Sequence, residues 1–340
     1  MNRSENFTEV LQQCPACGAE GRELLIQEAR DLLISSPPCT FNVWRCKPCQ
    51  SAFISPRPGR GHMGGFYAAS EYLPITDLEA LEFTTNGSPR CGWIKWVVRG
   101  ICDLPYRLRY GSPSTTFPPF GNRRLLDVGC GQGFYLAEMQ RQGWHVYGCD
   151  ISREKVECLT RVFGPDRVLH GEVDQVTFRG GFFDAVSLWH VIEHLYDSAS
   201  ALQRVYELLR PGGRLVIGTP NATSPEARTF GRWWVGYDVP RHLVVFSRRS
   251  LLALLERAGF TVTGVRPSLW ATSAPDSVAF YFKGRFGWNI WKSRLHKGIH
   301  YALYPLVSCS RVLGNSSIIE VTAVRPYAST CGSLPAGVIL

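Results

Sequence analysis

The sequence predicts an α/β fold in which a mostly parallel sheet is covered by helices on both faces. From residue 121 onward, short apolar runs alternate with helical patterns, and this alternation is typical of parallel sheets. Residues 125–134 read as a strand, a glycine-rich turn and the start of a helix. Asp150 ends the next predicted strand. A glycine turn followed about twenty residues later by an acid is typical of nucleoside binding by such sheets.

Each element of this sheet is expected from its own local pattern. Apolar runs predict strands near 124–128, 145–149, 167–170, 183–188, 214–219, 261–266 and 318–324. Patterns with helical spacing predict helices near 134–142, 152–163, 198–210 and 248–258. The first two strands carry the glycine turn and the acid, so the ligand is expected at their carboxyl ends.

The spacing of the glycines separates two classes of nucleoside. Gly129, Gly131 and Gly133 form the pattern GxGxG, whereas a dinucleotide site of the type GxGxxG needs glycine where this chain has Phe134. A helix N-terminus favours the anionic pyrophosphate of a dinucleotide. A sulfonium cofactor is cationic at its centre and favours a carboxylate, and Asp127 lies just before the turn.

These residues resemble the class I S-adenosylmethionine methyltransferases, whose first motif is an apolar strand ending in DxGCGxG. Similar motifs follow in order at 170–173, 183–190 and 209–217. The resemblance implies a Rossmann-like methyltransferase sheet whose last strand is antiparallel. It places Asp127 near the amino group of the cofactor, Asp150 on the ribose and Glu172 near the adenine. The cofactor contacts that it implies are Asp127, Gly129, Cys130, Gly131, Gly133, Phe134, Asp150, Ile151, Glu172, Val173, Trp189 and Tyr67.

Two CxxC pairs predict a metal site near the amino terminus. Cys14 and Cys17 form one pair, and Cys46 and Cys49 form the other, with 28 residues between them. Four thiolates at this spacing can enclose one Zn²⁺ tetrahedrally and leave no open position, so a structural zinc ribbon is expected over 1–58. A redox pair and free structural thiols are the alternatives. Gln50 follows the second pair where a glycine is preferred.

The ribbon extends the resemblance. A group of bacterial methyltransferases of polysaccharide and natural-product assembly starts with a similar ribbon, and the similarity covers residues from about 14 to 266. It includes the segment 55–58 and the tyrosines Tyr67 and Tyr72. Some of these relatives methylate carbons of nucleotide-linked deoxysugars and others methylate hydroxyls. The resemblance therefore implies a small acceptor such as a sugar, a sugar-linked intermediate or a natural product.

The rest of the chain is expected to cover the active site. Residues 59–120 are interpreted as a linker and helical lid, and 121–340 as the methyltransferase domain. Within that domain, 267–314 combines aromatic and basic residues, which suits a substrate cap, a membrane-surface helix or a packing helix. We favour the cap, and a weak contact with a membrane surface stays open.

Four side chains that follow the fourth and fifth strands are candidate bases: His190, Glu193, His194 and His242. On a helix starting near 190, His190 and His194 would share one face. We favour His194 and His242, since a relative that methylates sugar carbons also holds histidine at the place of His194. A metal site of the HxxEH type is rejected, because the motif ends a sheet strand.

Composition limits the remaining functions. The formal charge is +9, but the cations are scattered rather than in runs, which disfavours a dedicated nucleic-acid surface. The first ten residues have no apolar run and no window reaches eighteen apolar residues, so the cytoplasm is expected. The sequence thus predicts an S-adenosylmethionine-dependent methyltransferase that acts on a small molecule. An RNA methyltransferase and a non-catalytic cofactor-binding adaptor are the alternatives, and oligomeric state cannot be read from the sequence.

Overall fold

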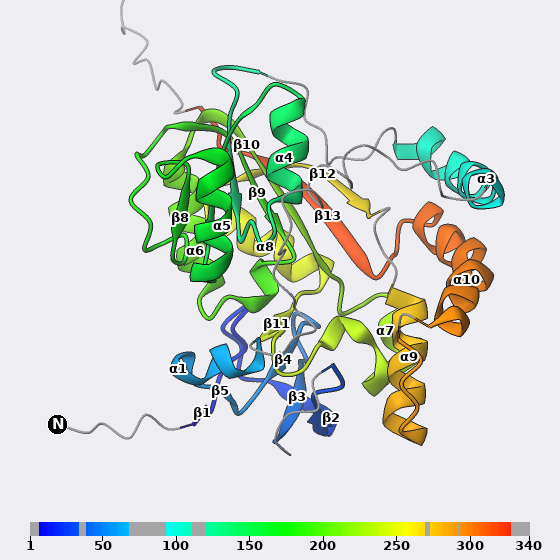
Figure 1. Ribbon diagram of the computed structural model, residues 1–340. Coiled ribbons are helices and arrows are strands. Elements are labelled where there is room, and N and C mark those ends of the chain that lie inside the picture. The colour runs from blue at the N-terminus through cyan, green and yellow to red at the C-terminus, as the bar shows by residue number, and fades with distance from the viewer. Residues whose placement is uncertain are drawn as a thin grey trace, which may run out of the picture.

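A seven-stranded sheet forms the centre of the molecule (Figure 1). The computed structural model describes residues 7–33, 39–67, 93–110, 120–268, 273–291 and 293–327. The strands are β6 (Arg124–Val128), β7 (His145–Asp150), β8 (Val168–His170), β9 (Phe183–Trp189), β10 (Leu209–Pro220), β12 (Thr261–Pro267) and β13 (Ile318–Val324). They run in the order β12-β13-β10-β9-β6-β7-β8, and of these seven only β13 is antiparallel to its neighbours. The predicted Rossmann-like sheet is confirmed.

Alternate residues of the central strands build a separate core on each face of the sheet. Leu125 packs with the helices α4 (Phe134–Arg141) and α5 (Arg153–Phe163). Leu126, its neighbour in β6, belongs to the other core, with α6 (Ser198–Leu208) and α8 (Arg248–Arg257). Both leucines are fully buried. A strand buried on both faces reads as a continuous apolar run, which is why the sequence pattern identified β6.

The amino-terminal module forms a second sheet with a strand from the carboxyl-terminal half of the chain. Its strands are β2 (Arg22–Arg30), β3 (Thr40–Cys46) and β4 (Ala52–Ile54), and β11 (Val244–Val245) pairs antiparallel with β4. Two short strands, β1 (Thr8–Glu9) and β5 (Arg57–Pro58), pair beside this sheet. The helical turns α1 (Arg60–Met63) and η1 (Gly64–Phe66) follow.

Polar contacts also join the module to the first turn of α8. Ser247, the N-cap residue of this helix, accepts from Ser250 N and donates to the carbonyl oxygen of Cys49 at 2.6 Å. The hydroxyls of Ser51 and Ser250 lie 2.6 Å apart, and all three serines are buried. The residues that cap the helix therefore also hold the second cysteine pair against it. The predicted domain boundary at 58 stays a prediction.

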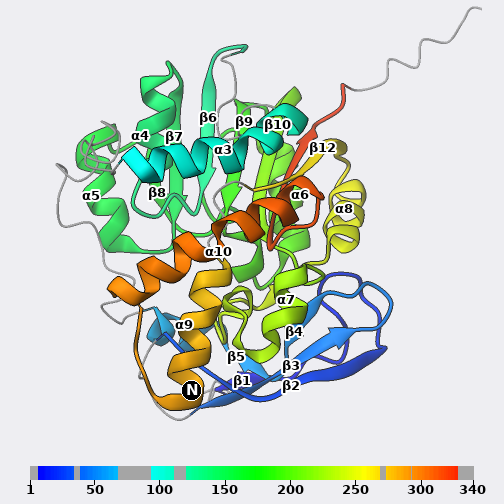
Figure 2. The same ribbon diagram turned by 90° about the vertical axis from the view of Figure 1, so that its right-hand side faces the viewer.

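Three helices gather on one side of the sheet, to the right in Figure 1 and toward the viewer in Figure 2. They are α3 (Trp93–Tyr110), α9 (Ser273–Phe286) and α10 (Arg294–Val312). A buried hydroxyl of Tyr304 on α10 donates to Asp103 on α3 at 2.8 Å. Inside this layer, α9 packs on α7 (Pro225–Phe230) and on the turns η4 (Gly231–Trp233) and η5 (Val235–Tyr237).

None of the helices in the described part of the chain has the length and apolar character needed to span a bilayer.

Candidate active site

The glycine turn after β6 has the backbone shape that its sequence predicts. Gly129, Gly131 and Gly133 all have positive φ, at 66°, 54° and 79°. A Cβ at Gly129 would lie 2.5 Å from Val191, and one at Gly133 would lie 2.4 Å from Leu159. At Gly131 the nearest atom to such a Cβ is 3.9 Å away. Two glycines therefore serve packing, and Gly131 leaves open space beside the turn.

Asp150, at the end of β7, holds this turn with both carboxylate oxygens. Oδ2 accepts from the backbone N–H of Gly131 at 2.8 Å, and Oδ1 accepts from that of Ser152 at 2.8 Å. Each oxygen keeps a further lone pair. A carboxylate fixed in this way can accept two adjacent hydroxyls, as a ribose presents them.

A cavity of about 710 Å³ opens at the carboxyl ends of β6 and β7. Its volume falls within the range of small-molecule and cofactor sites. Its lining includes these predicted cofactor contacts: Tyr67, Gly129, Gly131, Asp150, Ile151, Glu172 and Val173. Two of the predicted bases, His190 and His194, line it as well.

The other predicted contacts lie outside this lining. Cys130 is buried in the core that holds Leu125. Gly133 caps α4, and Phe134 begins that helix. The ring of Trp189 packs on Tyr135 and so close to Gly218 that a Cβ there would be 2.5 Å from it. Contacts of these four residues with a cofactor stay predictions.

Asp127 is buried directly behind the glycine turn. Its side chain accepts from the hydroxyl of Ser187 at 2.7 Å, and the residue is 3% exposed. Burial raises the pKa of Asp127 to about 7, and the nearby Asp150 acts in the same direction. A cation placed beside this carboxylate would reverse both effects. Asp127 also lies outside the lining of the cavity, so its pairing with a positive group of a cofactor stays a prediction.

Glu172 lines the cavity and forms a bridge across it to the amino-terminal module. Its carboxylate oxygens lie 2.8 and 3.1 Å from Arg60 Nη1. The Arg60 guanidinium also lies over the ring of Tyr196, 4.8 Å from its centroid. An adenine contact of Glu172 stays a prediction.

The helix expected to start near 190 is not formed, so that prediction was wrong. His190 has φ of 54°, and a single 3₁₀ turn, η3 (Ile192–His194), follows it. The left-handed residue redirects the chain at the end of β9, and His190 and His194 do not share a helix face. Instead His190 Nδ1 lies 3.2 Å from Glu193 Oε1.

Glu193 is fully buried, and each of its carboxylate oxygens has one partner. Its other carboxylate oxygen accepts from Thr219 Oγ1 at 2.9 Å. Burial alone would raise the pKa of Glu193, but the hydrogen bond from His190 and the surrounding histidines hold it at about 2. The hydrogen bond to Glu193 and its negative charge raise the pKa of His190, whose side chain is 45% exposed.

His194 presents a neutral imidazole to the cavity. Its Nδ1 lies 2.9 Å from both the Tyr67 hydroxyl and the carbonyl oxygen of Arg241. Since a carbonyl only accepts, Nδ1 carries the proton and Nε2 of the neutral ring is free. Burial lowers the pKa of His194 to about 4, assisted by His242. Burial raises the pKa of Tyr67, which keeps its hydroxyl neutral.

His242 packs edge-on against His194, with ring centroids 4.6 Å apart. Its Nδ1 donates to the carbonyl oxygen of Gly236 at 2.8 Å. The side chain is buried and does not line the cavity. Of the two favoured histidines, the structure thus brings His194 to the cavity and places His242 behind it.

A buried arginine behind this pair is a feature that the sequence reasoning missed. Arg241 is fully buried and binds two carboxylates: Asp31 at 2.6 and 2.9 Å and Asp238 at 2.7 and 3.0 Å. It also donates to the carbonyl oxygen of Phe66, next to Tyr67, at 3.2 Å. Arg241 therefore holds both His194 and Tyr67, and Asp31 links it to the amino-terminal module. The only sequence signal was its place beside His242.

The four predicted zinc ligands come together. Sγ atoms of Cys14 and Cys49 are 3.7 Å apart and those of Cys17 and Cys46 are 3.5 Å apart. All four lie within 4.8 Å of one another. Sulfurs in a tetrahedral site with Zn–S bonds of about 2.3 Å are about 3.8 Å apart. The cluster therefore fits a zinc ion.

Equivalent turns follow both cysteine pairs. Gly18 N bonds to Cys14 O at 2.7 Å and Gln50 N to Cys46 O at 2.8 Å. Both Gly18 and Gln50 are left-handed, with φ of 77° and 62°. The glutamine adopts the backbone shape for which glycine is preferred, so the departure in the sequence does not change the turn.

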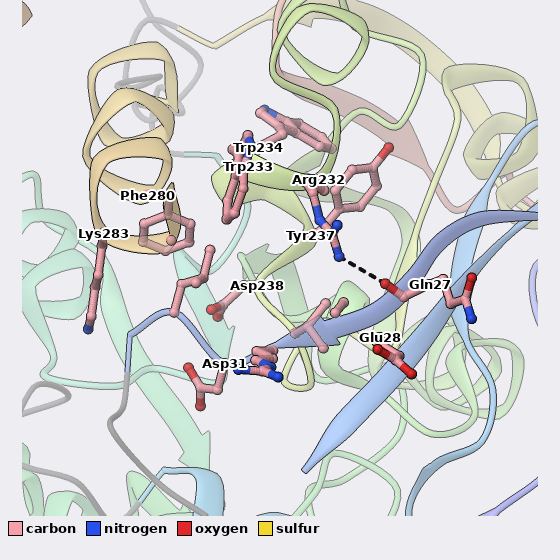
Figure 3. Close-up of a pocket in the computed structure, with 15 residues that line it drawn as sticks. Gln27, Glu28, Asp31, Arg232, Trp233, Trp234, Tyr237, Asp238, Phe280 and Lys283 are labelled. Carbon is pink, nitrogen blue, oxygen red and sulfur yellow. Dashed lines mark hydrogen bonds between the residues drawn. The ribbon is translucent and has the colours of Figure 1, made fainter. Parts of the chain in front are cut away.

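A second cavity, of about 690 Å³, lies between the end of β2, the turns η4 and η5, and α9. Figure 3 shows Trp233 and Phe280 on one side of it and the acids Glu28 and Asp31 on the other. Arg232 crosses to the carbonyl oxygen of Gln27 at 2.9 Å. Among the described residues, α9 lines this cavity and does not line the first.

Comparison with known protein families agrees with this geometry. A family model described as a methyltransferase domain matches residues 101–265. This part of the chain is similar to methyltransferase domains. The match spans the glycine turn, Asp150 and His194, and it ends before α9 and α10.

Curated relatives resemble part of this chain. A ubiquinone biosynthesis O-methyltransferase of Xylella fastidiosa is 34% identical over 125 residues, which cover 35% of this chain and 49% of the relative. One of the same name from Ruegeria pomeroyi is 29% identical over 177 residues, covering 46% and 70%. The matched residues thus span 49% of the length of the first relative and 70% of the second.

Solved structures with the same kind of domain are more distant. An S-adenosylmethionine-dependent methyltransferase from Mesorhizobium loti is 18% identical, with a TM-score of 0.43 over 67% of this chain and 100% of its own. The 1,6-didemethyltoxoflavin-N1-methyltransferase of Burkholderia thailandensis is 16% identical, with a TM-score of 0.42 over 82% and 96%.

Proposed function

We propose that this chain is an enzyme that moves a methyl group from S-adenosylmethionine to a small biosynthetic acceptor by direct displacement. The observation that carries the proposal is the cavity at the ends of β6 and β7, which has a fixed carboxylate at one side and a neutral histidine at the other. Asp150 and His194 both line it. Binding and proton removal are thus available in one space.

The cofactor, when bound, supplies an electrophilic methyl group on a sulfonium. Asp150 would accept the two ribose hydroxyls with the lone pairs that its backbone partners leave free. Asp127 would pair, through its buried carboxylate, with the cationic amino group. Gly131 would allow the cofactor to approach the main chain, because no side chain occupies the space beside it.

His194 is proposed as the general base toward the acceptor. Its free Nε2 would take the acceptor proton as the new bond to the methyl carbon forms and the sulfonium bond breaks. Arg241 and Tyr67 would keep the Nδ1 proton in place, since both oxygens lie 2.9 Å from that nitrogen. Glu193 and His242 are positioning residues in this scheme, because neither lines the cavity.

The acceptor is proposed to carry a hydroxyl on a sugar, a sugar-linked intermediate or a natural product. The names of the curated relatives, which are O-methyltransferases of ubiquinone biosynthesis, favour oxygen as the methylated atom. The resemblance of the ribbon and of the segment 55–58 to sugar-modifying enzymes favours a sugar. Methylation of carbon on such a sugar is the second candidate, since a neutral His194 could also remove a proton from carbon.

The four cysteines are proposed to hold one structural Zn²⁺. With four sulfur ligands the ion has no open position for water or substrate, so its contribution is to the fold. The ribbon contacts the active site through Asp31 and Arg241. Loss of the ion is therefore expected to disturb the position of His194, because Asp31 binds Arg241 and the carbonyl oxygen of Arg241 contacts His194.

Binding of S-adenosylhomocysteine tests the cofactor site without knowledge of the acceptor. Asp150→Ala removes two hydrogen bonds to a charged acceptor, which together contribute about 2 to 3 kcal/mol, so titration calorimetry should show Kd rising about 30- to 150-fold. Asp174→Ala, which removes an exposed acid outside the cavity, should leave Kd unchanged. Equal affinity of the Asp150 variant and the parent protein would reject the ribose assignment.

Methyl transfer from labelled S-adenosylmethionine to a panel of phenols and nucleotide-linked sugars tests the base. His194→Gln should lower kcat by about 10²- to 10⁴-fold with unchanged affinity for S-adenosylhomocysteine. Salt-sensitive RNA binding with RNA methylation would favour the nucleic-acid alternative. A protein that binds S-adenosylhomocysteine but transfers no methyl group would favour the adaptor.

A further inference from the structure

We propose that the outer face of α3, α9 and α10 docks on the surface of an anionic phospholipid bilayer. The inference does not depend on the proposed methyl transfer, because it concerns helices that lie outside the matched family region or on its edge. It rests on three observations: the charge of this face, its exposed apolar side chains, and the common side of the molecule on which the three helices lie.

The segment that forms α9 and α10 has a one-sided charge. From Ser277 to Ile319 the sequence contains no aspartate or glutamate, but it contains six lysines and arginines. Two of these are turned inward: Arg311 lies 3.7 Å from the buried Asp103, and Lys283 donates to the carbonyl oxygen of Leu33. Among the side chains of these helices that the structure describes, the exposed cations are Arg107, Arg109, Arg285, Arg294 and Lys297.

The acids of these helices do not offset that charge at the surface. Asp103 is buried between α3 and α10, where it accepts from Tyr304. Asp276 in the first turn of α9 faces His296 at 3.0 Å. Glu226 on the neighbouring α7 is buried. The exposed surface of the three helices is therefore cationic, which complements anionic headgroups.

Large apolar side chains project from the same helices. Leu108 on α3 is 79% exposed, and Leu306 and Leu313 at the end of α10 are 69% and 78% exposed. At the far end of α9, Trp288 is 60% exposed and stacks on Phe282 at an interplanar angle of 9°. Phe286 lies 5.4 Å from Trp288, between ring centroids. Isolated exposed apolar residues are common, and Val10 and Ile151 are examples elsewhere on the molecule. Nine of the sixteen exposed large apolar side chains in the described part of the chain lie on these three helices or directly after them, and such a concentration marks a contact surface.

The arrangement fits a bilayer surface better than a nucleic acid. Both views place α3, α9 and α10 together on one side of the molecule (Figures 1 and 2). Helices that lie in the membrane interface combine tryptophan, phenylalanine and leucine on the buried side with lysine and arginine around them. Aromatic and basic residues also bind single-stranded RNA by stacking, but the exposed leucines would have no partner there.

Vesicle flotation with the full chain tests the proposal. The protein should float with vesicles that contain 30% phosphatidylglycerol, and binding should weaken as salt rises, because the Debye length shortens. Each basic residue near an anionic surface contributes about 1 kcal/mol, or about a five-fold change in binding. The double variant Arg294→Glu, Lys297→Glu should therefore bind at least about 25-fold more weakly.

Substitutions at Arg294 and Lys297 should change membrane binding without changing the stability of the fold. Both lie in the first turn of α10 after the N-cap residue Ser293. Acids are favourable and cations unfavourable at a helix N-terminus, so the reversal should not weaken the helix. The matched control is Arg161→Glu, Arg179→Glu, which changes the net charge equally at exposed positions outside the three helices. It should float as the parent protein does.

A second variant tests the apolar contribution. Phe286→Ser, Trp288→Ser should reduce flotation, and its thermal melting should match that of the parent. The proposal is rejected if the protein does not float with anionic vesicles, or if the Arg294 and Lys297 variant floats equally well. It is also rejected if the chain is a dimer that the Trp288 variant dissociates, or if the face binds RNA and not vesicles.

Discussion

Removal of the Asp31 carboxylate tests whether the amino-terminal module holds the active site. Asp31 accepts two hydrogen bonds from Arg241, at 2.6 and 2.9 Å. The arginine is fully buried. Breaking one partner of a buried ion pair costs about 3 to 5 kcal/mol. Because Arg241 keeps Asp238 and the Phe66 carbonyl, we expect the Asp31→Ala variant to lose about 3 kcal/mol of unfolding free energy.

The assay is urea unfolding followed by circular dichroism, with a second measurement at the site. Affinity for S-adenosylhomocysteine should stay within about two-fold, since Asp31 does not line the cofactor cavity. The rate of methyl transfer should fall, because the carbonyl of Arg241 fixes the His194 tautomer. Asp174→Ala removes an exposed acid and should change stability by less than about 0.5 kcal/mol. If Asp31→Ala is no more destabilising than this control, the buried network does not join the two parts of the protein.

Three further predictions concern protons and metal. Burial raises the pKa of Asp127 to about 7, so binding of S-adenosylhomocysteine should strengthen as pH rises from 6 to 8, and Asp127→Asn should remove this dependence in calorimetry. Burial lowers the pKa of His194 to about 4, so its base form persists in acid, and the methyl-transfer rate at saturating S-adenosylmethionine should stay constant down to about pH 5. A pH–rate profile with a midpoint near 6.5 would contradict that assignment. Mass spectrometry of metals should find one zinc per chain, lost in Cys46→Ser and kept in the control Cys158→Ser.

Local sequence patterns predict the sheet well and the base poorly, for physical reasons. A strand such as β6 is buried on both faces, so its apolar run is visible in the sequence. The prediction of a helix at 190 was wrong because His190 takes a left-handed backbone conformation. Histidine, unlike glycine, gives no signal in the sequence for this conformation. Arg241 and Asp31 are 210 residues apart in the chain. No local pattern records such a pair, and the same holds for the pairing of β4 with β11.

The pairing of β4 with β11 has a consequence for synthesis of the protein on the ribosome. β4 ends at Ile54, and its partner β11 starts at Val244, so roughly 190 residues are synthesised between the two. At about 5 to 20 residues per second this takes about 10 to 40 s. During that time the two CxxC pairs can come together, but the edge of the sheet at β4 has no partner strand. The nascent chain must keep that edge from pairing elsewhere until the carboxyl-terminal half emerges.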